Sequence, residues 1–356
     1  MPPLAVTDVV LASGRVCRPA LPTSFKPMDI NESDPYLRIW RNVCKTARES
    51  FAYPVEESWF LFPASGIGDQ MLMLSLLRAF RSHHGGRITL CADQRMLSLL
   101  HLYHGYFDGL VVVDGVNVWA MRPYARFALG HPYFPWNGLH GDGRLYDFCL
   151  DHDVSLADLT RHLMHLPPEA ETAPPVVPDS VRAEAEQRFR ALGLVPGKTV
   201  ILAPIANSIP HIIPKEWWAA LVHLLAVRGL TVAINQRNGS RGFDAITLAH
   251  DTAIPGAIPF DCPLAEIIPL ADLAGYHLSA RSGISEVLSY STARGKVVYP
   301  IGPATPPGSG DGLDWRASHL GAGGTVGIRR LYGNAACEEI NVLPTTTPEE
   351  ALQGWL

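Results

Sequence analysis

Two short glycine-containing stretches place charged side chains where catalysis and phosphate binding would need them. The first, Ala64-Ser-Gly-Ile-Gly-Asp69, lies between an apolar run and an amphipathic one. Gly66 and Gly68 permit a tight turn there and let a ligand approach backbone N–H groups closely, so phosphate contact is expected at both. Asp69, at the start of the expected helix, is placed to cap free N–H groups or to act as a general base toward a hydroxyl nucleophile. Both roles are open for this carboxylate.

The second stretch combines a fixed positive charge with the start of an expected helix in Ser279-Ala-Arg-Ser-Gly-Ile-Ser-Glu286. A guanidinium beside the N–H groups of a helix N-terminus suits a diphosphate. Glu286 would accept hydrogen bonds from ribose hydroxyls, or it is a first-turn glutamate favoured by the helix dipole. The expected diphosphate ligands are Arg281 and the backbone N–H groups of Ser282, Gly283 and Ile284.

Polar residues also follow the apolar run at 198–203, which is an expected strand. Asn207 and Ser208 follow this strand, and Lys215 begins the next expected helix. Groups at the carboxyl ends of parallel strands commonly meet ligands, so these three side chains are candidates for binding phosphate. A solvated Lys215 in the first helical turn is the alternative.

Other cofactor and metal patterns are weaker. A dinucleotide fingerprint would need glycine or alanine where the chain has Met71, although Asp93 fits the expected acidic position about 20 residues further on. Asp151-His152-Asp153 matches the D-x-D metal pattern of some sugar transferases, but no clear buried strand precedes it. We therefore expect no metal ion and no cofactor beyond a nucleotide co-substrate.

Strand-like apolar runs alternate with amphipathic stretches from Trp59 onward, which predicts βα units on parallel sheets in two doubly wound halves. A helix over 69–82 is expected to follow the first strand. A stretch with five prolines at 166–178 predicts a stiff linker between the halves. The expected organisation is an N-terminal extension packed on the first domain (1–56), a first domain (57–165), the linker (166–178), a second domain (179–330) and a tail (331–356).

Composition excludes several classes of protein. Hydrophobic residues make up 47% and charged residues 18% of the 356 residues, as in globular proteins. The formal net charge of -5 argues against a dedicated nucleic-acid binder. The six cysteines form no C-x-x-C pair, so reduced thiols are the simplest interpretation. The N-terminal residues lack the pattern of a secretory signal, and no apolar stretch reaches about 18 residues, which predicts a cytoplasmic protein.

The motifs resemble those of the ADP-heptose:lipopolysaccharide heptosyltransferase family, glycosyltransferase family 9, and of related bacterial polysaccharide transferases. Ser65 to Phe80 resembles the family's G-x-G-D run followed by an apolar helix, and Leu202 to Trp218 resembles its strand, polar loop and Lys-Glu-Trp-Trp. Arg281 to Glu286 stands where the family has Asp-Ser/Thr-Gly-Pro-x-His, and keeps only the Ser-Gly centre. The likeness covers roughly 57–105 and 198–302. Since Arg and Glu replace Asp and His, the donor need not be ADP-heptose.

The resemblance implies a GT-B fold, an α/β architecture in which two Rossmann-like domains face a central cleft. It implies an inverting, metal-independent sugar transfer with Asp69 as base, and with Ser208 and Lys215 on the donor phosphates. The expected partners are a nucleotide-sugar donor and a saccharide or lipid-linked saccharide acceptor in surface polysaccharide synthesis. A lipid-linked acceptor would bring the protein into peripheral contact with the inner membrane. A nucleotide-sugar epimerase and a noncatalytic nucleotide-sugar-binding protein are the alternatives.

Overall fold

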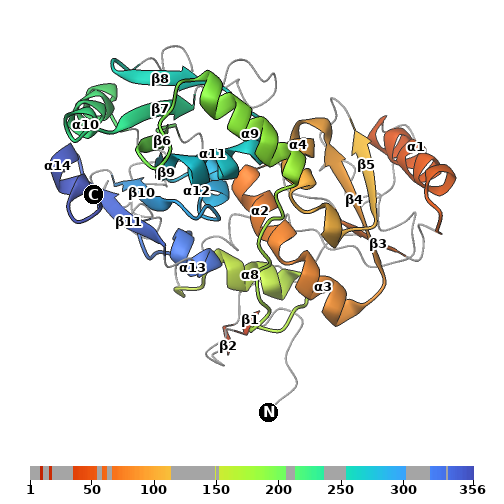
Figure 1. Cartoon of the computed structure of the whole chain (residues 1–356). Coiled ribbons are helices and arrows are strands. Elements are labelled where there is room, and N and C mark those ends of the chain that lie inside the picture. Colours follow the sequence, from red (N-terminus) through yellow and green to blue (C-terminus); the bar gives the residue numbers. More distant parts are fainter. Residues whose placement is uncertain are drawn as a thin grey trace. The chain divides into compact units, whose positions relative to one another are not determined.

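The computed structural model divides the chain into two compact units, unit 1 (Met1–Val176) and unit 2 (Val177–Leu356), whose elements are labelled in Figure 1. The division falls within the proline-rich stretch 166–178. Each unit is described by itself. The structure describes residues 9–10, 16–17, 35–53, 58–61, 66–113, 149, 152–205, 213–235, 254–301, 321–333 and 336–356.

Unit 1 contains a parallel three-stranded sheet in the order β3-β4-β5 among its described residues. A separate antiparallel pair, β1 with β2, contacts helix α8. The strands are β1 (Val9–Val10), β2 (Val16–Cys17), β3 (Ser58–Leu61), β4 (Arg87–Asp93) and β5 (Gly109–Val113). The helices are α1 (Pro35–Ser50), α2 (Ile67–Ser75), α3 (Leu77–His84), α4 (Leu97–His101) and α8 (Leu156–Leu163), with 3-10 turns η2 (Gln94–Met96) and η3 (His104–Tyr106).

The single helix expected over 69–82 is two helices, α2 and α3, joined at Leu76. The carbonyl of Ser75 accepts a hydrogen bond from the Ala173 N–H at 2.6 Å, so a neighbouring segment binds the group that would continue the helix. The Ser75 hydroxyl also donates to the Leu72 carbonyl at 2.7 Å, a contact that bends helices. Local periodicity could not reveal a break that depends on a residue almost a hundred positions away.

Unit 2 contains a parallel six-stranded sheet in the order β11-β10-β9-β6-β7-β8. Numbered along this unit, the order is 3-2-1-4-5-6, the arrangement of a doubly wound dinucleotide-binding fold. The second Rossmann-like half expected from the sequence is therefore confirmed for unit 2. The strands are β6 (Thr199–Ala203), β7 (Thr231–Asn235), β8 (Ala257–Phe260), β9 (Gly275–Ala280), β10 (Arg294–Pro300) and β11 (Cys337–Val342).

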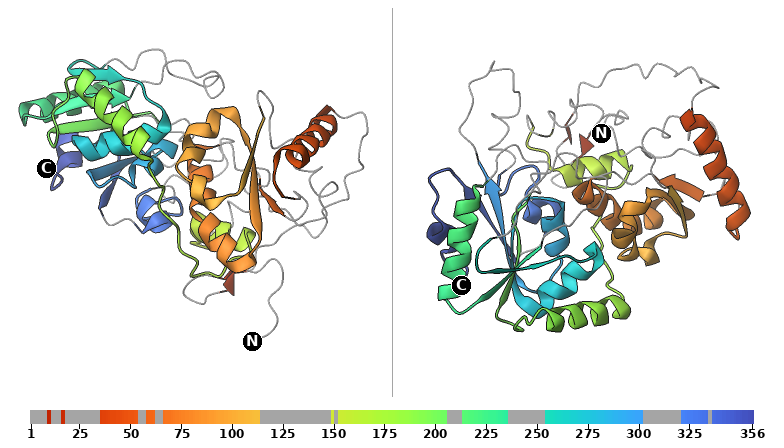
Figure 2. Two further views of the ribbon diagram at one scale, coloured as in Figure 1. Left: turned by 45° about the vertical axis from the view of Figure 1, so that its right-hand side comes forward. Right: turned by 90° about the horizontal axis from the view of Figure 1, so that it is seen from above.

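Helices cover both faces of this sheet, as Figure 2 shows from two sides. On one face, α10 packs on β7 and α14, and Trp218, Leu221 and Trp355 join the core there. On the other face, α11 lies over β6 and β9 and contacts α9 and α12. The helices are α9 (Asp179–Ala191), α10 (Lys215–Val227), α11 (Ile267–Ala274), α12 (Gly283–Leu288), α13 (Ile328–Tyr332) and α14 (Pro348–Leu352), with the 3-10 turn η5 (Leu264–Glu266).

The segment expected to be a tail, 331–356, belongs to the body of unit 2. It supplies the sixth strand, β11, and the covering helix α14. The Lys296 side chain in β10, 4% exposed, donates to the Ala351 carbonyl at 2.8 Å and lies 3.2 Å from the Glu338 carboxylate. Its ammonium thus reaches the end of α14, where unpaired carbonyls favour a cation. Burial lowers the pKa of Lys296, and Glu338 opposes that effect.

The middle of the sheet encloses one uncharged histidine. His277 in β9 is 1% exposed, and its ring lies so close to Gly295 in β10 that a Cβ there would be 2.2 Å from Nε2. Burial lowers the pKa of His277 to about 4, although Asp272 favours the charged form. Its Nδ1 is buried with no hydrogen-bond partner among the described residues. His277 is therefore neutral near pH 7.

Among the described residues, no helix is both long enough and apolar enough to span a bilayer.

Candidate functional site

The strand order of unit 2 determines where a ligand is expected to bind. Chain order reverses between β6 and β9, which lie side by side with Ala203 opposite Ser279. In open α/β sheets, ligands bind outside the carboxyl ends of the strands at such a reversal. We call this the β6–β9 edge, and it is formed by the residues that follow Ala203 and Ala280. The sequence-predicted residues of unit 2 lie on the two connections that leave it.

The connection after β9 is a tight turn into α12. Ser282 is the N-cap, in an extended conformation with φ -162° and ψ 174°, and its N–H donates to the Ser285 hydroxyl at 2.9 Å. That hydroxyl donates to the Ser282 carbonyl at 2.5 Å. Gly283 and Ile284 are half-buried at the start of the helix. Hydrogen bonds between N-cap and third helical residue fix this turn without any help from a ligand.

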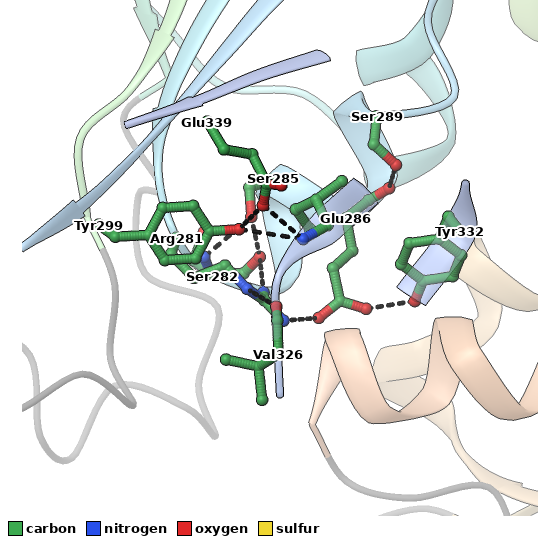
Figure 3. Close-up of polar contacts among 10 residues, drawn as sticks. Arg281, Ser282, Ser285, Glu286, Ser289, Tyr299, Val326, Tyr332 and Glu339 are labelled. Atoms are coloured by element: carbon green, nitrogen blue, oxygen red, sulfur yellow. Dashed lines mark hydrogen bonds and ion pairs between the residues drawn. The ribbon is translucent and has the colours of Figure 1, made fainter. Parts of the chain in front are cut away.

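Arg281 does not offer a free charge to a ligand. Its side chain is 9% exposed and pairs with the Glu286 carboxylate, with 2.7 Å between Nη2 and Oε1 (Figure 3). The Nε atom donates to the Val326 carbonyl at 2.9 Å, and Nη1 donates to the Ser282 carbonyl at 3.0 Å. The prediction of an open cation is corrected, because burial of a guanidinium requires partners and this chain supplies them.

Glu286 is likewise occupied by protein donors. Glu286 is 4% exposed. One of its carboxylate oxygens accepts a hydrogen bond from Arg281, and the other accepts one from the Tyr332 hydroxyl. Burial alone would lower the pKa of Arg281, but the Glu286 charge and two nearby tyrosines outweigh it, and the pKa is raised. The prediction that Glu286 accepts hydrogen bonds from ribose hydroxyls is therefore corrected: its carboxylate is paired with Arg281 inside the protein.

A second carboxylate, that of Glu339, binds the other end of α13. Glu339 in β11 accepts from the Tyr299 hydroxyl and from the Ile328 N–H at 2.6 Å, so it caps the start of α13. The Tyr332 ring packs edge-on against Tyr290, with centroids 5.4 Å apart. Burial raises the pKa of Tyr299, which remains a hydroxyl donor. These contacts join α13 to β10, to β11 and to Tyr290, which follows α12.

The connection after β6 is less enclosed. Lys215 is exposed in the first turn of α10, next to the N-cap Pro214. Asn207 and Ser208 lie outside the described residues. At the same end of the sheet, the Ser279 hydroxyl in β9 and Oδ1 of Asn235 at the end of β7 are buried without a hydrogen-bond partner among the described residues. Buried polar atoms normally have partners, so both atoms keep an unmet hydrogen-bonding capacity within the part of the chain that the structure describes.

In unit 1, Asp69 lies in the first turn of α2 and is half-buried. Its carboxylate bends back over Gly66, the N-cap, so closely that a Cβ on Gly66 would be 2.8 Å from Oδ2. Gly66 is needed for this approach rather than for an unusual dihedral angle, because its φ is -78°. Gly68 is buried within the helix. The structure thus brings Gly66 and Asp69 together.

Metal binding gains no support from the described residues, which hold no group of three or more histidine, cysteine, aspartate or glutamate side chains suited to an ion. Of the D-x-D stretch, Asp151 lies outside the described residues, and Asp153 has a left-handed φ of 53°.

Comparison with known proteins identifies the fold. No family model and no curated protein matches the sequence. The structure matches ADP-heptose LPS heptosyltransferase II of E. coli with a TM-score of 0.55 and 15% identity, over 83% of this chain and 96% of that one. A family 9 glycosyl transferase of Veillonella parvula matches with a TM-score of 0.49 and 12% identity, over 68% of this chain and 80% of that one. The chain has a heptosyltransferase-like fold. The resemblance predicted from the sequence is thus confirmed for the fold.

Within this heptosyltransferase-like fold, the sequence motifs identified the turns but missed what surrounds them. Tyr332, Glu339 and the Val326 carbonyl lie far along the chain from Arg281, in a stretch without a recognisable motif. The only signal in the sequence was the unusual pair itself, an arginine and a glutamate five positions apart where the family has Asp and His. Because the two replacements carry opposite charges, they could have suggested that Arg281 and Glu286 contact each other.

Proposed function

We propose that this chain is a glycosyltransferase that moves a sugar from a nucleotide-diphosphate sugar to a hydroxyl group of a saccharide or glycolipid acceptor. The observation that carries the proposal is the match to heptosyltransferase II along 83% of the chain, combined with a strand-order reversal at the β6–β9 edge. The name of that protein pairs an ADP-linked sugar with LPS. Synthesis of bacterial surface polysaccharide is the proposed context.

The donor is proposed to bind at the β6–β9 edge. Lys215 and the backbone N–H groups of Gly283 and Ile284 lie on the two connections that leave this edge, whereas the predicted Ser282 N–H is already bound to the Ser285 hydroxyl. With Asn207 and Ser208, they would hold the diphosphate. A cation and oriented N–H groups stabilise the charge that develops on a departing diphosphate, which is the work a metal ion does in other transferases. Metal-independent transfer is part of this proposal.

The proposed reaction is an inverting displacement. The acceptor oxygen forms a bond to the anomeric carbon while the bond from that carbon to the donor phosphate breaks, and the nucleoside diphosphate leaves with the electron pair. The Asp69 carboxylate takes the proton of the acceptor hydroxyl. Asp69 lies in the first turn of α2, where its carboxylate bends back over Gly66.

The first experiment is a thermal-shift screen of the purified protein with UDP, GDP, ADP, CMP and dTDP and the corresponding sugar conjugates. A ligand that binds only the folded state stabilises it by about 2.7 kcal/mol at a concentration of 100 times Kd. We expect one nucleotide family to raise the melting temperature. Incubation of that donor with saccharide acceptors should then give an acceptor-dependent product. Turnover of the donor without any acceptor, or no shift with any nucleotide, would contradict the proposal.

A further inference from the structure

Arg281 and four neighbouring side chains make buried and half-buried contacts that the proposed chemistry does not yet use. The contacts form two sets, Arg281–Glu286–Tyr332 and Tyr299–Glu339, which both reach α13. We call these five residues the Arg281 cluster; they are Arg281, Glu286, Tyr299, Tyr332 and Glu339 (Figure 3). Each comes from a different place in the fold: the end of β9, α12, β10, α13 and β11. The cluster therefore brings together elements that lie far apart in the sequence of unit 2, from β9 to β11.

The guanidinium of Arg281 has a protein partner on each of its three nitrogen atoms. Two of the partners are backbone carbonyls, of Ser282 at the N-cap of α12 and of Val326 in the turn before α13. The third is the Glu286 carboxylate. Three of its five N–H donors are thus bound within the protein, and the side chain is only 9% exposed, so the cation is turned to protein partners rather than presented to a phosphate. The Arg281 side chain therefore links two backbone turns by hydrogen bonds, and we call this link the brace.

The carboxylates extend this brace to α13. Glu286 accepts from the hydroxyl of Tyr332, the last residue of α13, and Glu339 accepts from the N–H of Ile328, its first residue. Tyr299 donates to Glu339 and its hydroxyl also lies 3.0 Å from the Ile328 nitrogen. Both ends of α13 are thus bound to carboxylates, one of them the partner of Arg281.

We propose that Arg281, Glu286 and Tyr332 are positioning residues that hold the 281–284 turn and residues 326–332 as one unit at the β6–β9 edge, without touching the donor. This inference rests on the proposed function, since the edge is where the donor is proposed to bind. It reverses the role predicted for Arg281 from its charge. It also assigns a role to Tyr332, which no sequence motif identified.

The two possible roles of Arg281 predict opposite effects of the substitution Glu286→Gln on nucleotide affinity. If the guanidinium binds the diphosphate, Glu286→Gln removes a competing negative charge, and affinity for a nucleoside diphosphate is unchanged or higher. If Arg281 and Glu286 position the turn, Glu286→Gln and Arg281→Met both weaken binding, because each leaves a buried charge without its counter-charge. The double variant Arg281→Met/Glu286→Met removes both charges together and should then bind better than Arg281→Met alone.

The experiment measures ADP affinity by calorimetry, with the other diphosphates of the screen in parallel. We expect at least tenfold weaker binding for Glu286→Gln and Arg281→Met, and partial recovery in the double variant. Tyr332→Phe removes only the hydroxyl that reaches Glu286 and keeps the ring beside Tyr290, so it should fold and bind about threefold more weakly. Unchanged or tighter binding by Glu286→Gln would overturn the proposal.

Lys296→Met is the matched control, because Lys296 is also a buried cation that contacts one glutamate and one backbone carbonyl. It should lower the melting temperature while ADP affinity stays within twofold of wild type. An equal loss of affinity in this control would show that general destabilisation is enough, and would overturn the proposal.

Hydrogen exchange of peptides covering 321–333 tests the brace without any ligand. Exchange there should become faster in Glu286→Gln and Tyr332→Phe, but not in Lys296→Met; unchanged exchange would overturn the proposal. If wild-type protein bound no nucleotide, the proposed function would fail while this measurement still decided whether the brace exists.

Discussion

The two units start a helix after a strand with nearly the same five residues, yet the acidic residue does different things in each. Unit 1 has Ser65-Gly-Ile-Gly-Asp69 and unit 2 has Ser282-Gly-Ile-Ser-Glu286. The N-cap is Gly66 in the first and Ser282 in the second, so the helix starts one position later in the pattern of unit 1. Asp69 becomes the third helical residue and Glu286 the fourth.

That shift of one residue decides where each carboxylate points. A third helical residue can reach back to its own N-cap, as Asp69 does over Gly66. In α12 the third position is Ser285, which binds back to Ser282 instead. Glu286 is left to pair with Arg281, which occupies the position held by Ala64 in unit 1. Similar motifs therefore produce a half-buried carboxylate in one unit and a buried ion pair in the other.

The largest expected effect separates the two carboxylates by function. Asp69→Asn should lower acceptor-dependent turnover by a factor of about 10² to 10⁴, the usual contribution of a general base. The free energy of unfolding should change by no more than about 1 kcal/mol, the usual contribution of an acidic side chain in the first turn of a helix. Asp179→Asn, in the first turn of α9, is the control and should keep full turnover. Full activity of Asp69→Asn would remove Asp69 from the mechanism.

Glu286→Gln, unlike Asp69→Asn, should lower the free energy of unfolding strongly. Breaking a buried ion pair by removing one partner costs about 3–5 kcal/mol, since Arg281 is left buried without its counter-charge. Urea unfolding of the variant should give a correspondingly lower midpoint. A loss below about 1 kcal/mol would mean that the pair is as weak as an exposed one.

Lowering the pH should destabilise unit 2, because His277 is buried in its neutral form. Its folded pKa of about 4 lies below the ordinary value of 6.5, so the unfolded chain binds the proton first. The stability that comes from neutral His277 is complete above pH 6.5 and is lost as pH falls toward 4, with a total of about 3 kcal/mol at most. Proteolysis at pH 5 should cut unit 2 faster than at pH 7. His277→Gln should flatten that dependence, and an unchanged slope would contradict the assignment.

The smallest expected effect tests the glycine in unit 1. Gly66→Ala would place a methyl group 2.8 Å from Asp69 Oδ2, so the carboxylate must move. A displaced catalytic group loses rate steeply, and we expect turnover to fall about tenfold while the fold is kept. Gly105→Ala serves as the control, because nothing lies within 4 Å of its added Cβ. Equal rates in the two variants would show that the position of Asp69 is not critical.

The sequence predicted most of the strands and helices because apolar alternation and glycine stops are local signals. The strands around β6 and β9 and the turns holding Asp69 and Arg281 were predictable for that reason. Three features were not. The break at Leu76 depends on Ala173, β11 was hidden in an expected tail, and the partners of Arg281 come from residues 299–339. Each depends on contacts between distant segments, which periodicity does not encode.

The contribution of the last segment to the core of unit 2 has a consequence for synthesis on the ribosome. Leu352 and Trp355 lie in the same core as β6 and β7, and Lys296 is held by the carbonyl of Ala351. Domains generally fold as units while the chain emerges from its N-terminal end. Unit 1 can complete its packing early, but unit 2 must wait with an open apolar face until residue 355 has left the exit tunnel. Nascent unit 2 is therefore the part of this protein that a chaperone would be expected to meet.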